Sequence, residues 1–143
     1  MKISPTGAAL IQSFEECRLT VYLDLRGIRT IGWGHTGPDV VPGLVWTQEQ
    51  ADSHFLLDIA TTEAAVSHSV TVALSQNQFD ALCSLCFNIG SGNFHSSTLV
   101  KDINSGNALD EQRALKEWDH ISGRQNAGLD RRRAAEWSLF CEQ

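Results

Sequence analysis

The sequence predicts an α+β fold with a small N-terminal β-hairpin lobe and a larger helical lobe. Two β-prone segments separated by turn residues lie between Arg18 and Ile31, and beyond Thr47 the apolar residues recur at helical spacing. With 143 residues, 42% of them hydrophobic, the chain suits a single domain over residues 1–143 with a sizeable core. We expect the helix after Thr47 to join the two lobes, with a cleft between them.

The first expected elements lead to one point in the chain. Apolar residues at helical spacing predict a helix over Gly7–Phe14, so that Glu15 would lie near its C-terminal end. Two β-prone segments follow, Arg18–Tyr22 and Ile28–Ile31, and residues 24–27 between them have the composition of a turn. A helix end, a loop and a returning strand would therefore converge on one pocket.

The remainder of the chain is predicted to be helical. Thr47 has the properties of an N-cap, with Gln50 completing a capping box. The apolar residues expected on the buried face of this helix are Ala51, Phe55, Leu56 and Ile59. A second helix would begin at Ser75 and continue to Gly90. Further helices are expected over Ser97–Asn104, Leu109–Trp118 and Asp130–Cys141.

Glu15, Asp24 and Thr30 can supply the groups that acid-catalysed cleavage of a glycosidic bond requires. One carboxyl group gives a proton to the leaving oxygen, and a second activates a water or attacks the sugar. Each residue also has an ordinary structural interpretation. A Glu at a helix end is commonly a solvated charge, an Asp three residues before Gly commonly forms a turn, and Thr is common in strands.

A longer pattern favours the catalytic interpretation. From Glu15 the chain reads Glu, three residues, Leu, then Tyr-x-Asp, two residues, Gly, two residues, and Thr-Ile-Gly-x-Gly-His. This pattern resembles the phage T4-type lysozymes, the endolysin family of glycoside hydrolases. Similar segments cover nearly the whole chain: T-Q-E-Q-A at 47–51, L-S-Q-N-Q-F-D-A-L at 74–82, F-N-I-G at 87–90 and G-L-D-R-R-R-A-A-E at 128–136.

The resemblance implies hydrolysis of the β-1,4 bond between N-acetylmuramic acid and N-acetylglucosamine in peptidoglycan, with inversion and without a cofactor or metal. Glu15 would be the general acid, Asp24 the carboxylate on the opposite face and Thr30 the hydroxyl that positions water. The chain departs from the family in having Glu16, where Gly is common, and this larger side chain could crowd the cleft. Two alternatives remain: a transglycosylase on the same bond, and a wall-binding module without catalysis.

The same resemblance implies supporting residues. Asn88 matches a position near the cleft, and Trp118 would lie beside it; alternatively they are a helix-end polar group and a core aromatic. One arginine among Arg124 and the run Arg131, Arg132 and Arg133 would approach Glu15, or this run would form a solvated helix face paired with Glu136.

A His and an Asp of the family form an ion pair at the positions of His35 and Asp58, which would tie the hairpin lobe to the connecting helix.

Composition limits the other classes of function. A formal charge of −6 argues against general nucleic-acid binding, and no apolar run approaches the ~20 residues of a membrane span. Residues 1–5 lack the apolar stretch of a signal peptide. Together with these observations, the resemblance implies a monomer made in the host cytoplasm, which acts on periplasmic peptidoglycan after membrane permeabilisation. The four cysteines, Cys17, Cys83, Cys86 and Cys141, lack the spacing of a zinc site and are expected to be reduced.

Overall fold

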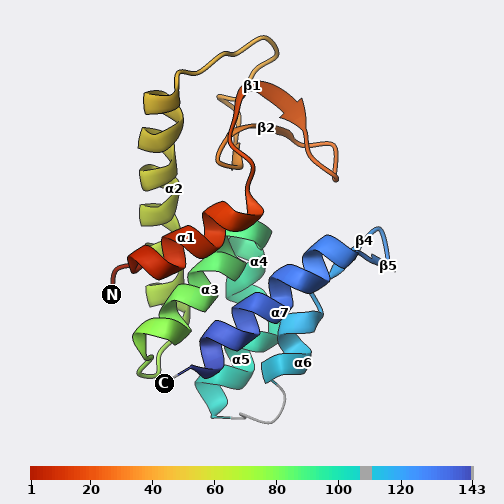
Figure 1. Cartoon of the computed structure of the whole chain (residues 1–143). Helices are drawn as coiled ribbons and strands as arrows, with labels where there is room; N and C mark the ends of the chain where they lie inside the picture. Colours follow the sequence, from red (N-terminus) through yellow and green to blue (C-terminus); the bar gives the residue numbers. More distant parts are fainter. Residues whose placement is uncertain (107–110, 143) are drawn as a thin grey trace.

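The computed structural model describes residues 1–106 and 111–142, and its fold is α+β, as predicted (Figure 1). The small lobe is an antiparallel sheet of three strands in the order β1-β2-β3: Arg18–Leu23, Arg29–Gly32 and His35–Thr36. β3 was not expected, since a strand of two residues leaves no alternation to detect. The helix α2 (Gln48–Ser69) leads from this lobe to the helical lobe, as predicted for the segment after Thr47.

Helix α1 (Pro5–Phe14) delivers Glu15 to the junction of the two lobes. It begins two residues before the predicted start because Ser4 caps it, accepting a hydrogen bond from the Gly7 N–H at 3.2 Å, and Pro5 suits the first turn. At its other end the Glu15 N–H donates to the Ile11 carbonyl at 3.1 Å. Glu15 itself has extended backbone angles, so its side chain leaves the helix at the point where the chain turns toward β1.

The hairpin lobe packs around Ile31, Val40, Trp46 and Ala51, all of which are buried. Gly32 shows how tight this packing is. Its φ is +64°, and a Cβ at this position would lie 2.9 Å from the Trp46 ring, so that a side chain is excluded both by conformation and by space. The lobe therefore has a small core of its own, which holds the segment between Glu15 and β3 in place.

Helix α2 begins with the predicted capping box: the Thr47 side chain accepts from the Gln50 N–H, and the Gln50 side chain accepts from the Thr47 N–H. Ala51, Phe55 and Ile59 are buried, as expected. The prediction for Leu56 is wrong, because this side chain is 68% exposed. It follows Phe55 by one position, which is about 100° around the helix and away from the packed face.

The helical lobe is built around α3 (Gln76–Ile89), which has α1, α2, α4 and α7 packed against it. This helix begins after Ser75 and ends at Gly90, as predicted; Ser75 and Gln78 form a capping box at its start, and Gly90 has a φ of +84°. The other elements are α4 (Ser91–Ser96), α5 (Thr98–Ser105), α6 (Glu111–Lys116), β4 (His120–Ile121), β5 (Arg124–Gln125) and α7 (Ala127–Cys141). No helix among the described residues is long and apolar enough to cross a bilayer.

These elements confirm most of the predicted helices and add short ones. Helix α5 matches the helix expected over residues 97–104. Of the helix expected over residues 109–118, residues 109 and 110 lie outside the described residues. Helix α7 begins three residues before the predicted start, because the Asn126 side chain accepts from the N–H groups of Gly128 and Leu129, both at 3.0 Å. Helix α4 and the β4–β5 hairpin were missed, since each is too short to show a period.

The cysteines fall into two classes of reactivity. Cys83 and Cys86 belong to α3 and lie in the core of the helical lobe, where burial raises the pKa of Cys86 to about 11 and that of Cys83 further still. We expect a thiol reagent at about pH 8 to modify exposed Cys141 at least ~100-fold faster than these two, because the thiolate is the reactive form. Mass spectrometry of the native protein over time measures these rates. Equal rates at Cys141 and Cys86 would contradict the buried placement.

Candidate active site

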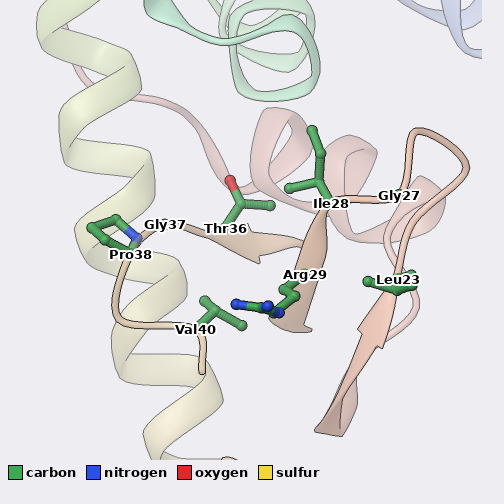
Figure 2. A pocket seen from close by; sticks show the side chains of 8 residues that line it. All are labelled: Leu23, Gly27, Ile28, Arg29, Thr36, Gly37, Pro38 and Val40. Atoms are coloured by element: carbon green, nitrogen blue, oxygen red, sulfur yellow. The ribbon is translucent and has the colours of Figure 1, made fainter. Parts of the chain in front are cut away.

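An open cavity of about 560 Å³ lies on the hairpin lobe, next to the β1–β2 turn (Figure 2). Its lining includes Leu23, Ile28 and Arg29 from the hairpin and Thr36, Pro38 and Val40 from the segment after it. None of the residues predicted for catalysis lines this cavity. The candidate site lies instead where Glu15 meets the helical lobe.

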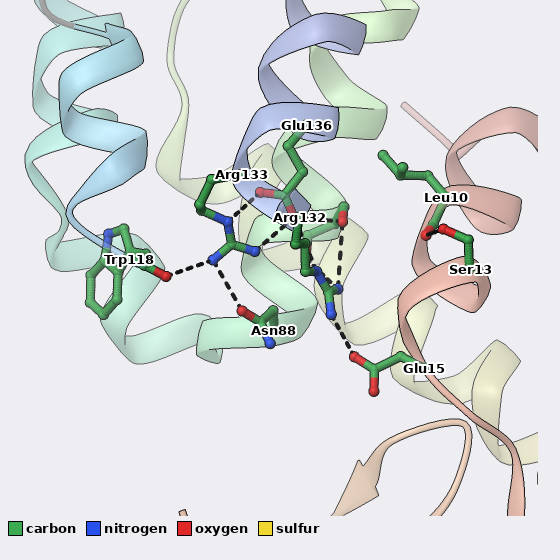
Figure 3. Close-up of polar contacts among 9 residues, drawn as sticks. Leu10, Ser13, Glu15, Asn88, Trp118, Arg132, Arg133 and Glu136 are labelled. Carbon is green, nitrogen blue, oxygen red and sulfur yellow. Dashed lines mark hydrogen bonds and ion pairs between the residues drawn. The ribbon is translucent and has the colours of Figure 1, made fainter. Parts of the chain in front are cut away.

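Glu15 is held from the opposite lobe by Arg132. The Arg132 Nη1 donates to Glu15 Oε1 at 2.7 Å, and the exposed fractions of the two side chains are 4% and 18% (Figure 3). The resemblance implies that one arginine of this part of the chain approaches Glu15, and Arg132 is the one that does. Arg131 and Arg124 are exposed to solvent, and Arg133 turns toward other partners.

A buried network fixes Arg132 in this position. Its Nε donates to Glu136 Oε1 at 3.2 Å, and its Nη2 donates to the Ser84 carbonyl at 3.1 Å. Glu136 is completely buried and also receives the Ser84 hydroxyl at 2.7 Å and Arg133 Nη2 at 2.8 Å. Since Nε and Nη2 of the guanidinium are bonded to α7 and α3, Arg132 presents Nη1 to Glu15.

Arg133 joins Asn88 and Trp118, the two residues predicted to bind sugar. Its Nη1 donates to Asn88 Oδ1 at 3.0 Å and to the Trp118 carbonyl at 3.2 Å (Figure 3). Asn88 is half-buried at the end of α3 and keeps its NH2 group as a donor. Trp118 is half-buried and packs on the core of the helical lobe. The two residues are thus neighbours, and their role toward sugar stays a prediction.

Asp24 and Thr30 lie on the hairpin. Asp24 Oδ1 accepts from the N–H groups of Arg26 at 2.8 Å and Ile28 at 2.9 Å, so this carboxylate does form the turn. Because Oδ1 accepts both hydrogen bonds, the carboxylate is held in one orientation, and Oδ2 accepts neither of them. Thr30 is 3% exposed, and its hydroxyl donates to the Ile28 carbonyl at 2.9 Å. The lone pairs of the Thr30 oxygen remain able to accept a hydrogen bond from water.

Tyr22 was not singled out from the sequence. Burial raises the pKa of its phenol, and the negative charges of Glu15 and Asp24 raise it further. The Arg18 guanidinium lies 4.5 Å from the centre of the Tyr22 ring and opposes this shift. The Tyr-x-Asp spacing was the available signal, because alternate residues of a strand share a face.

Gly34 allows the hairpin lobe to approach Glu15 closely. Its φ is +83°, and a Cβ at this position would lie 2.7 Å from Glu15 Oε2. The two oxygens of Glu15 therefore have different surroundings: Oε1 receives Arg132, and Oε2 faces the backbone of the β2–β3 turn.

His35 is paired on both ring nitrogens. Its Nδ1 lies 2.8 Å from Asp58 Oδ2, the contact implied by the resemblance, and its Nε2 lies 2.9 Å from Asp39 Oδ2, which was not expected. Burial alone would lower the pKa of His35, but the hydrogen bonds to the two carboxylates outweigh it and raise the pKa. The hydrogen bond to His35 lowers the pKa of Asp39.

These pKa shifts predict how the free energy of unfolding depends on pH. It is measured in buffer containing EDTA, which keeps metal ions away from His35. The contribution of His35 is complete below the unfolded pKa of about 6.5 and is lost as pH rises through the higher folded pKa. The contribution of Asp39 is present above about pH 3.9 and is lost as pH falls through its lowered pKa. We expect Asp58→Asn to lower the NMR-measured pKa of His35, with the largest loss of stability in mildly acidic solution. An unchanged His35 titration would refute the energetic coupling.

Known proteins resemble the chain over nearly its whole length. The family described as phage lysozyme matches residues 12–136. The endolysin of Acyrthosiphon pisum secondary endosymbiont phage 1 is 40% identical, and so is that of Salmonella phage P22; each alignment covers 98% of both proteins.

Solved structures agree with this relationship. The muramidase domain of SpmX from Asticaccaulis excentricus superposes with a TM-score of 0.86 at 38% identity, covering 99% of both chains. A mutant of P22 lysozyme gives a TM-score of 0.77 at 40% identity, again over 99% of both chains. The chain therefore belongs to the phage lysozyme family of glycoside hydrolases.

Proposed function

We propose that this chain is an endolysin that hydrolyses the β-1,4 bond between N-acetylmuramic acid and N-acetylglucosamine in peptidoglycan. The observation that carries the proposal is the placement of Glu15. This carboxyl group lies at the junction of the lobes, is 18% exposed, and is held on one oxygen by the buried Arg132. The relatives named as endolysins and the solved muramidase domain support the same activity.

In the proposed reaction Glu15 is the general acid. Arg132 occupies Oε1, so Oε2 is the oxygen that carries the proton and gives it to the leaving glycosidic oxygen. Oε2 faces Gly34, where the missing side chain leaves room beside the backbone. Protonation of the leaving group lowers the barrier as the anomeric carbon takes on oxocarbenium character.

Asp24 and Thr30 would prepare the attacking water on the other face of the sugar. Asp24 Oδ1 is fixed by two backbone N–H groups, so Oδ2 can take the proton from water. The Thr30 hydroxyl donates a hydrogen bond to the Ile28 carbonyl, and its oxygen can accept a hydrogen bond from the other O–H of the same water. Attack on the face opposite to the leaving group gives an inverted product. Asn88, with its free NH2 group, and Trp118 would contact the glycan.

We also propose where the protein is made and where it acts. A monomer of one domain, made in the host cytoplasm, would reach periplasmic peptidoglycan once the inner membrane is permeabilised. The formal charge of −6 gives no long-range attraction to an anionic cell wall. Binding would therefore rely on hydrogen bonds to the sugar chain, and no cofactor is needed.

Loss of turbidity of Gram-negative cells with a permeabilised outer membrane tests this function. We expect rapid clearing and, by mass spectrometry, fragments with ordinary reducing ends. Fragments ending in a 1,6-anhydro sugar would instead identify a transglycosylase, in which the muramyl hydroxyl replaces water. Binding to cell walls without any bond cleavage would identify a wall-binding module.

A further inference from the structure

Two histidines and an aspartate gather on the hairpin lobe outside the catalytic residues. His35 comes from β3, Asp39 from the loop after it, and His54 from α2. One ligand-type atom of each residue lies within 4.8 Å of those of the other two, and His35 Nε2 is 2.9 Å from Asp39 Oδ2. Two parts of the chain, β3 with the loop that follows it and α2, thus direct two imidazoles and one carboxylate to the same point.

Asp58 and Trp46 hold the histidine rings in place. Asp58 accepts from His35 Nδ1 at 2.8 Å, so the other ring nitrogen, Nε2, is the one directed at Asp39. The His54 ring stacks on the Trp46 ring with centroids 4.1 Å apart and lies 5.1 Å from the His35 ring. A carboxylate behind a histidine, bonded to its second nitrogen, is the arrangement that orients metal-binding histidines in proteins.

We propose that His35, Asp39 and His54 bind a divalent transition-metal ion of the zinc type, with Asp58 as the orienting partner of His35. Three protein ligands with nitrogen and oxygen donors suit zinc, and the fourth position would be filled by water. Imidazole donors disfavour magnesium and calcium, which prefer oxygen ligands. Asp39 is 53% exposed, so the ion can reach the cluster from solvent.

Binding of the ion requires shifts of the ligand atoms, some apart and some together. Bonds of about 2.0–2.1 Å in a tetrahedral site place the ligand atoms roughly 3.3 Å apart. His35 Nε2 and Asp39 Oδ2 would separate slightly from 2.9 Å, and the widest spacing in the cluster would shorten from its limit of 4.8 Å. The bound ion would replace the direct contact of His35 with Asp39 and would connect β3, the following loop and α2.

Calorimetric titration of the EDTA-stripped full chain with zinc chloride tests the site, at about pH 8, above the ordinary imidazole pKa of about 6.5. We expect one ion per chain, with magnesium chloride giving no binding. His54→Gln and Asp39→Asn should each weaken zinc binding about tenfold or more, and Asp58→Asn about 10–100-fold. His68→Gln is the matched control, because His68 is an exposed histidine on the same helix α2, near His95 rather than His35.

The proposal would be overturned by no zinc binding to the wild-type chain, or by unchanged affinity in a folded His54→Gln variant. Loss of binding in His68→Gln would overturn it as well, because the ion would then lie at the His68–His95 pair. A second measurement needs no variant. Paramagnetic cobalt should broaden the NMR signals of His35 and His54 before those of His68, His95 and His120, and the reverse order would refute the site.

Discussion

Glu15→Gln is expected to reduce the rate of peptidoglycan cleavage by about 10²–10⁴-fold, the usual loss when general-acid assistance is removed. The amide cannot give a proton to the leaving oxygen, although it keeps the shape of the carboxyl group and its carbonyl oxygen can still accept from Arg132. The folded structure should therefore survive. Cleavage is measured by release of reducing sugar, and folding by circular dichroism.

Glu16→Gln provides the control for this experiment. Glu16 is the next residue, its side chain is 76% exposed, and among the described residues it pairs with Arg18 on the surface, at 3.3 Å. The substitution removes the same charge at nearly the same place, so we expect activity close to that of the wild type. Glu15→Gln with near-wild-type activity in a folded protein would remove Glu15 from the mechanism. Equal losses in the two variants would indicate an effect of charge alone.

Glu136→Ala is expected to lower the free energy of unfolding by about 3–5 kcal/mol, the range found when one partner of a buried ion pair is removed. Glu136 is 0% exposed and lies within 2.7 Å of Arg133 Nε and 3.2 Å of Arg132 Nε. The alanine variant would leave two guanidinium groups buried without this carboxylate. Urea denaturation measures the loss, and activity should fall with it because Arg132 loses its support.

Glu117→Ala is the matched control, because Glu117 is exposed, and changes at such surface positions usually stay within about 0.5 kcal/mol. A loss below about 1 kcal/mol for Glu136→Ala would mean that Glu15, Asn88 and the Ser84 carbonyl compensate for the missing charge. In that case the arginines would be held by the whole network rather than by Glu136.

The sequence by itself determined the elements whose signals are local. The capping boxes at Thr47 and Ser75 involve residues three positions apart, and both helices begin where predicted. The two segments of the hairpin and the turn at Asp24 depend on neighbouring residues, and they form as expected. Glu15, Asp24 and Thr30 were recognisable because they lie within sixteen residues of one continuous pattern.

Only the tertiary structure decided which side chains of the later segments meet this pattern. Arg131, Arg132 and Arg133 are indistinguishable in composition, but successive residues of a helix point about 100° apart. The packing of α7 against α3 therefore selects Arg132, which reaches Glu15 across 117 positions of sequence. The same rotation exposes Leu56 beside buried Phe55. Local hydrogen bonds define where helices and turns form, whereas the choice of partner depends on how whole elements pack, and no short window of sequence contains that information.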